Sequence, residues 1–151
     1  MKKFILLLCV LVASEFLYAY DNVIPGQNNV SVTQNSNNKI EPYQLQEKKH
    51  YKIDMLSAGG FNLPFEADIC AVKEGVTFVT GDGDGNVEGM EIYIIKKVEK
   101  RSQAFFYTFE NGNMMVGKSG DYIIIRISVD GKTNTFYASS TPYSAPTLKR
   151  K

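Results

Sequence analysis

Residues 122–138 read YIIIRISVDGKTNTFYA, and this stretch decides the fold class. Ile123, Ile125 and Ile127 alternate with side chains of the opposite face, which is the period of two that a β-strand imposes. Asp130-Gly131 then supplies two residues that tolerate positive φ, as the tight turn of a hairpin requires. The stretch therefore predicts two antiparallel strands joined at this turn.

The same alternation recurs upstream. Tyr51 and Ile53 face one way while Lys52 faces the other, as a half-buried strand requires. The apolar runs 67–72 and 76–80 are separated by three residues and predict a second hairpin. Another strand is marked by alternating apolar residues: Met90, Ile92, Ile94 and Val98.

Turn residues separate these runs. Asn111-Gly112 and Ser119-Gly120 are tight-turn signals, and Gly59-Gly60 and Pro64 are expected to break the chain. About eight short strands result, and no segment has a helical period. The sequence therefore predicts an all-β fold, a single antiparallel β-sandwich or small β-barrel of about eight short strands spanning residues 43–140.

The N-terminus has the layout of a secretory signal peptide. Lys2 and Lys3 precede an apolar run at 4–13, and Ala19 places a small residue before a cleavage point. The run is too short to span a bilayer as a permanent helix. We therefore expect residues 1–19 to be removed, which leaves a periplasmic or secreted chain with no stable membrane anchor. The short, two-lysine start is typical of a bacterial signal.

Two further segments flank the predicted β-domain. Residues 20–42 are rich in Asn and Gln and hold few large apolar side chains, which predicts a disordered leader. Residues 141–151 contain prolines and end in Lys149-Arg150-Lys151, which predicts a flexible basic tail.

Charge and cysteine content exclude some classes of function. Cleavage after Ala19 leaves about 130 residues, enough for one domain, with equal numbers of basic and acidic side chains. A neutral chain has no general field that recruits nucleic acid, so no nucleic-acid partner is expected. Cys70 becomes the only cysteine, which is either buried as a small hydrophobe, the favoured interpretation, or used to bridge two chains.

The stretch TGDGDGNVEGME, residues 80–91, is the strongest candidate for a binding loop. Asp82, Asp84, Asn86 and Glu88 lie on a connection between two strands. Asp82, Asp84 and Asn86 could ligate calcium in an irregular oxygen cage, although the helix-loop-helix calcium motif fails because Val87 stands where that motif needs glycine. The favoured interpretation is a plain turn in which Asp and Asn bond their own backbone, so no cofactor is assigned.

An aromatic strand offers a second candidate surface. Phe105, Tyr107 and Phe109 share one face of the run 104–109. The favoured interpretation is that this face is buried in the core, and the alternative is that it contacts a partner.

Enzymatic functions are disfavoured by inventory. His50 is the only histidine, and its alternation places it on the polar face among lysines. Carboxylate pairs such as Glu66 and Asp68 could act as acid and base, but no pattern places them in a cleft. The chain is therefore expected not to be an enzyme.

These observations predict an exported, non-enzymatic β-domain. Its layout resembles that of exported β-domains in bacterial envelope assemblies such as pili and secretion machines, and this resemblance implies a class of function but no residue roles. We expect an interaction or assembly component of the cell envelope that binds an envelope protein or surface polymer through a sheet edge, the aromatic face or the 81–89 loop. The alternatives are a ligand-binding or calcium-supported module for a small molecule or glycan, and a secreted effector or inhibitor.

Overall fold

The computed structural model describes residues 39–150. The predicted signal peptide and residues 20–38 of the predicted leader lie outside this range. The described residues form ten strands: β1 (Glu41–Pro42), β2 (His50–Ala58), β3 (Phe61–Val72), β4 (Gly75–Gly81), β5 (Val87–Ile94), β6 (Lys97–Lys100), β7 (Phe105–Thr108), β8 (Gly112–Ser119), β9 (Tyr122–Val129) and β10 (Lys132–Ser139).

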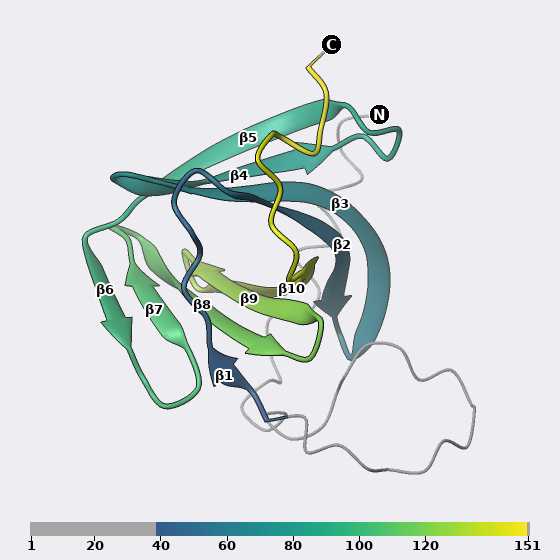
Figure 1. Cartoon of the computed structure of the whole chain (residues 1–151). Coiled ribbons are helices and arrows are strands. Elements are labelled where there is room, and N and C mark those ends of the chain that lie inside the picture. The colour runs from purple at the N-terminus through teal and green to yellow at the C-terminus, as the bar shows by residue number, and fades with distance from the viewer. Residues whose placement is uncertain (1–38, 151) are drawn as a thin grey trace, which may run out of the picture.

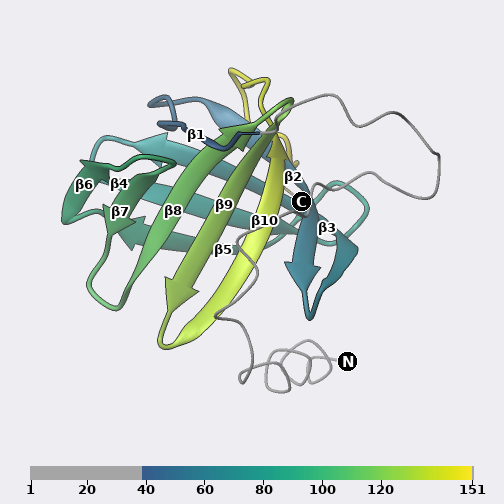
Figure 2. The same ribbon diagram turned by 90° about the horizontal axis from the view of Figure 1, so that it is seen from below.

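All ten strands belong to one sheet. Nine of them follow the order β5-β4-β3-β2-β10-β9-β8-β7-β6, and β1 pairs with β8 outside this path. Every pairing between these strands is antiparallel. The sheet is strongly curled and open, so that β4 and β5 lie across from β8, β9 and β10, above them in Figure 1 and behind them in Figure 2. The predicted all-β, antiparallel class is confirmed, with ten strands where about eight were expected and a half-barrel where a sandwich or barrel was expected.

The opening lies between β5 and β6, which are consecutive in the chain but stand at opposite ends of the strand order. Only Ile95 and Lys96 connect them. The Ile95 N–H donates to the Glu74 carbonyl (2.9 Å) beside β4, and the Lys96 N–H donates to the Thr108 carbonyl (2.8 Å) at the end of β7. The chain therefore crosses from one edge of the sheet to the other at this corner, from which β5 and β6 diverge (Figure 1).

The tight turns are where the glycine pattern predicts them. Asp130 and Gly131 have φ of 50° and 77°, so both central residues of the β9–β10 hairpin are left-handed. Gly59 and Gly60 connect β2 and β3 in the same way, with φ of 59° and 80°. Pro64 does not end a strand: it lies inside β3 opposite Met55, next to a register shift in the β2–β3 ladder. Proline is tolerated there because a bulge leaves its missing N–H without consequence.

The core lies inside the curl. Alternate side chains of the strands point inward, as the sequence period predicts, and each fully buried Ile, Val or Met contributes about 1.5–3 kcal/mol. The innermost side chains come from five strands: Tyr51, Ile53, Ile69, Val76, Met114, Val116, Ile123 and Ile125.

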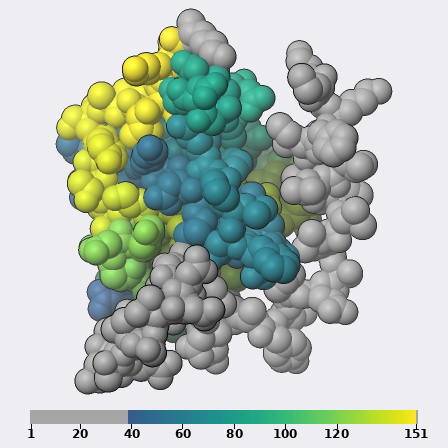
Figure 3. All heavy atoms as spheres, turned by 90° about the vertical axis from the view of Figure 1, so that its right-hand side faces the viewer, coloured from purple at the N-terminus to yellow at the C-terminus, as the bar shows by residue number. Residues whose placement is uncertain are grey.

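The ends of the described chain are attached to the sheet. Glu41 and Pro42, expected to belong to the leader, pair with Lys118 and Gly117 of β8. Residues 141–150 were expected to form a flexible tail, but the segment lies against the β2–β4 half of the sheet, as the band of yellow atoms in Figure 3 shows. Backbone bonds tie Tyr143 to His50 in both directions (2.8 and 2.9 Å). The described part of the predicted tail therefore has partners that are far away in sequence.

Candidate functional site

The predicted binding loop is organised around the carboxylate of Asp82. Its Oδ1 accepts hydrogen bonds from the amides of Asp84 (2.9 Å) and Asn86 (3.1 Å), and its Oδ2 accepts one from the Asn86 side-chain amide (3.0 Å). Asp84 points away as an exposed residue, and Glu88 lies exposed on β5. The structure thus brings Asp82 and Asn86 together in the manner of a turn, and it does not bring Asp84 or Glu88 to them.

A second carboxylate, that of Glu66 on β3, supports the same loop. Glu66 Oε2 accepts hydrogen bonds from the amides of Gly83 (3.0 Å) and Gly85 (3.1 Å). A Cβ at Gly81 would fall 2.5 Å from this oxygen, so glycine at that position leaves the space that the carboxylate fills. In the described range, no group of three or more His, Cys, Asp or Glu side chains is placed to hold a metal ion.

The aromatic candidate surface belongs to the core. Tyr107 and Phe109 are buried, and Phe105 is half-buried against the same cluster. The Tyr107 hydroxyl accepts a hydrogen bond from the Leu45 amide (3.1 Å). Phe106, on the opposite face of β7, lies 4.2 Å beneath the Arg101 guanidinium. Both faces of the strand are therefore covered by this chain, as the favoured interpretation expected.

The most buried charged side chain in the described range is Asp68 on β3, which is 2% exposed. Its Oδ1 lies 2.7 Å from His50 Nδ1, and because a carboxylate only accepts, this histidine nitrogen carries the proton. Its Oδ2 accepts from the Thr147 amide (2.9 Å) and hydroxyl (2.7 Å). The cluster ties β2, β3 and the C-terminal segment into one network.

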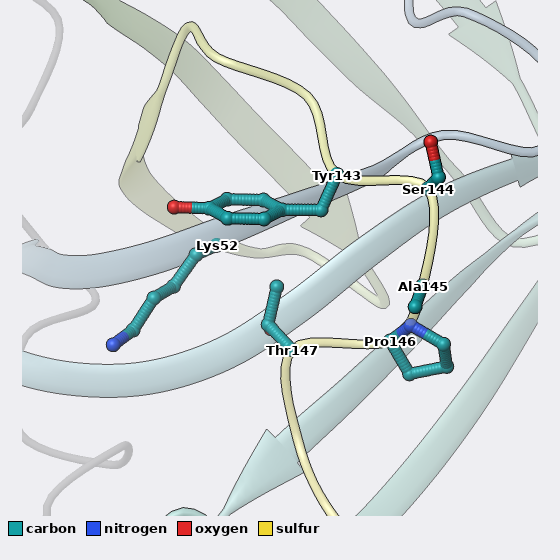
Figure 4. Close-up of a pocket in the computed structure, with 6 residues that line it drawn as sticks. All are labelled: Lys52, Tyr143, Ser144, Ala145, Pro146 and Thr147. Carbon is teal, nitrogen blue, oxygen red and sulfur yellow. The ribbon is translucent and has the colours of Figure 1, made fainter.

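A shallow hollow of about 460 Å³ lies beside this network, between β2 and the C-terminal segment. Figure 4 shows the side chains of Tyr143 and Lys52 extending to the same side, with Thr147 below the Tyr143 ring. Five of its six lining residues are exposed, so the hollow is open to water. Its lining residues are Lys52, Tyr143, Ser144, Ala145, Pro146 and Thr147, and His50 is not among them.

Cys70 lies next to this network and is buried, 4% exposed. It pairs with His50 across the β2–β3 ladder. Burial, followed by the negative charge of Asp68, raises the pKa of its thiol above the ordinary 9.0. The thiol is therefore kept protonated and covered, in agreement with the favoured interpretation of a small buried hydrophobe.

The two edges of the open sheet differ sharply in chemistry. β6 has four residues, and Glu99 lies between Lys97 (2.9 Å) and the nearby Arg101 (3.4 Å) in exposed ion pairs. The bond to Lys97, which has the largest effect, and the bond to Arg101 both lower the pKa of the Glu99 carboxyl. The edge therefore stays charged. Short, charged edge strands resist the addition of another strand.

The β5 edge is longer and apolar. Met90, Ile92 and Ile94 lie on one face and are 59%, 54% and 60% exposed. In an antiparallel ladder, the backbone N–H and C=O groups of successive residues point alternately toward the neighbouring strand and away from it. The bond from Ile95 N to Glu74 O shows that the Ile95 groups point toward β4, and it fixes this alternation, or phase, along β5. By this alternation the peptide groups of the same three residues point to the open side. The edge thus presents backbone donors and acceptors that no described residue bonds, together with an apolar row.

One end of this edge is already occupied by the chain's own C-terminal segment. The Lys149 N–H donates to the Gly85 carbonyl (2.9 Å), and the Lys149 carbonyl accepts from the Val87 N–H (2.9 Å). This is a parallel bridge centred on Asn86. No other segment within residues 39–150 bonds the rest of this edge, residues 88–94.

Sequence reasoning missed Thr147 and the structural roles of Asp68 and Glu66. The candidate pair Glu66 and Asp68 was visible in the sequence, but the two carboxylates serve different segments. A buried carboxylate was signalled weakly by the position of Asp68 at the start of the apolar run 69–72. No signal in the sequence pointed to Thr147, since its partner is 79 positions away.

Comparison of the chain with protein-family models, with curated proteins and with solved structures found no match. Among residues 39–150, no helix has the length and hydropathy of a membrane span.

Proposed function

We propose that this chain is an exported, non-enzymatic β-domain that serves as an interaction or assembly component of the bacterial cell envelope. It acts by accepting a strand from a protein partner at the open edge of β5. Export is supported by the signal-like sequence of residues 1–19. The choice of edge is supported by the geometry of β5.

The observation that carries the proposal is the coincidence of two features at Met90, Ile92 and Ile94. Their side chains are more than half exposed, and their peptide groups face outward by the phase of the ladder. An added strand gains backbone hydrogen bonds from the peptide groups and apolar contacts from the side chains, which is how sheet edges bind extended segments. An edge of this kind without a partner is a liability for aggregation, which favours a functional reason for it.

Proline substitution tests the choice of edge. Ile92→Pro removes an N–H that bonds nothing within the sheet, so the fold is expected to persist while strand addition is blocked. Val98→Pro is the matched control on β6. The bond from Arg101 N to Ala104 O fixes the alternation along this strand, so that the Val98 N–H also points away from the sheet. A photo-crosslinking residue placed at position 92 first identifies the envelope partner. Capture of this partner by the proline variants is then measured, and it is expected to fall at least tenfold in Ile92→Pro only.

The proposal would be abandoned if both proline variants captured the partner as well as the unchanged protein. Thermal unfolding monitored by circular dichroism verifies that each variant is folded. A crosslink from position 98 in place of position 92 would assign the function to the other edge.

A small-molecule or glycan ligand is the second candidate function. The observation that favours it is the exposed ring of Tyr143 (44%) at the hollow, with the Lys52 ammonium and the Thr147 side chain beside it. An aromatic ring flanked by polar groups suits a sugar or a small anion. Calorimetry with envelope glycans checks this: binding that is lost in Tyr143→Ala and kept in Tyr122→Ala would support it, and heat that survives Tyr143→Ala would assign the ligand elsewhere.

A further inference from the structure

We propose that the β5 edge pairs with the β5 edge of a second copy of this chain, antiparallel, with Ile92 opposite Ile92. The inference rests on the proposed function in one respect, that this edge accepts a strand, and it names a second copy as the strand donor. Three observations restrict the pairing: the phase of the ladder, the position of the C-terminal segment and the two carboxylates of β5.

The phase limits the possible registers. In an antiparallel pair each outward-facing residue must meet another outward-facing residue, so Met90, Ile92 and Ile94 meet one another across the two-fold axis. A two-fold centre at any residue from Met90 to Ile94 satisfies this rule, but only the centre at Ile92 pairs all three of these residues with one another.

The other centres are less favourable. Pairing centred on Met90 brings Ile94 of the second copy level with Asn86, where Lys149 already bonds the edge. Pairing centred on Glu91 places two carboxylates directly opposite each other, which destabilises a strand pair. Centres at Tyr93 and Ile94 leave Met90 opposite residues beyond the end of β5. The register that we propose is therefore centred on Ile92.

In this register the edge is complementary to itself. Met90 meets Ile94 of the second copy and Ile92 meets its own counterpart, so six apolar side chains that are more than half exposed form one covered row. About six backbone hydrogen bonds form between the outward peptide groups. On the opposite face Glu91 meets Tyr93, the residue whose hydroxyl already donates to Glu91 within one copy.

The charged β6 edge offers no equivalent surface, so the two-fold pairing closes at two copies and does not extend into a fibre. One strand pair is a small interface, so the dimer is expected to dissociate upon dilution to roughly micromolar concentration.

Single cysteine substitutions in the full chain test the register. Opposed residues of a hydrogen-bonded pair have Cα atoms about 5.5 Å apart, within disulfide range, whereas the two Met90 Cα atoms would be about 14 Å apart. Ile92→Cys is therefore expected to form a disulfide dimer under mild oxidation. Met90→Cys and Ile94→Cys should each remain monomeric alone and cross-link when mixed. The unchanged protein, with its own cysteines, sets the background.

Sedimentation of the unchanged protein over a range of concentrations gives the second readout. A monomer–dimer equilibrium that Ile92→Pro abolishes and Val98→Pro keeps is the expected result. A protein that stays monomeric throughout, or a Met90→Cys chain that cross-links as fully as Ile92→Cys, would overturn the inference. If Ile92→Pro still blocked partner capture in that case, the proposed function would stand and only the identity of the strand donor would fall.

Discussion

His50 Nδ1 lies 2.7 Å from Asp68 Oδ1, and this contact anchors the C-terminal segment to the sheet. The backbone of His50 pairs with Tyr143, and the other oxygen of Asp68 binds Thr147. Both ends of the segment 143–147 are therefore fixed to this residue pair, one end to the His50 backbone and the other to the Asp68 side chain. The histidine, expected to be a solvated surface residue, has a structural role.

Replacing Asp68 with Asn is expected to lower the free energy of unfolding by about 2–4 kcal/mol. The amide keeps the shape of the side chain, but it offers one acceptor atom where three donors converge. Urea denaturation measures the loss. Hydrogen exchange of the Thr147 amide reports on the segment itself, because that amide loses its acceptor.

Asp54→Asn is the matched control, since Asp54 is an exposed carboxylate on β2. It should change the unfolding free energy by about 0.5 kcal/mol or less. Equal stability of the Asp68 and Asp54 variants would show that the buried carboxylate does not anchor the segment.

Calcium addition separates a turn from a metal site in the 81–89 loop. Asp82→Ala is expected to cost about 1–2 kcal/mol with or without millimolar calcium, because the amides of Asp84 and Asn86 lose their acceptor. Asp84→Ala, at an exposed position, should cost about 0.5 kcal/mol or less. Thermal unfolding is the measurement. A rise in Tm upon calcium addition that both substitutions remove would restore the calcium interpretation.

Local features of this fold could be predicted, and features that depend on strand order could not. Asp130-Gly131 marks its turn because positive φ is a property of two adjacent residues. The corner at Ile95 and Lys96 has no such mark, and it decides that the sheet stays open between β5 and β6.

The same distinction applies to the candidate sites. The alternation of Met90, Ile92 and Ile94 predicts a strand, but only the position of β5 at the end of the sheet exposes these side chains. Asp68 meets partners 18 and 79 positions away, so no local pattern brings them together. The turn chemistry of Asp82 was predicted because its partners lie two and four residues further along.

Tyr107→Phe tests whether the aromatic face is core. The change removes the hydroxyl that accepts the buried Leu45 amide, which leaves an unpaired donor and is expected to cost about 1–3 kcal/mol. Tyr122→Phe, at a half-buried position that begins β9, is expected to cost about 0.5 kcal/mol or less. If Tyr107→Phe left the urea midpoint unchanged, the face would be available for a partner after all.

Stability is expected to fall in alkaline solution because of the buried phenols. Burial raises the pKa of Tyr51, Tyr93, Tyr107 and Tyr137 above the ordinary 10.0, and the hydrogen bonds of Tyr51 with Tyr43 and of Tyr93 to the Glu91 carboxylate raise the first two further. Above pH 10 the unfolded chain releases these protons while the folded chain keeps them. The stabilisation is therefore complete below pH 10 and is lost as the pH rises toward the folded-state values, by up to about 1.4 kcal/mol per pH unit for each group.

Tyr93→Phe isolates one contribution to this slope. Tyr93 stacks on Phe109 at 4.9 Å, and its hydroxyl bonds only the exposed Glu91 in the described structure, so phenylalanine keeps the packing at neutral pH. Urea midpoints measured from pH 8 to pH 11 should fall less steeply in the variant than in the unchanged protein. Parallel curves for the two proteins would mean that Tyr93 ionises equally well in both states, and its half-buried position beside an acid would then have no energetic consequence.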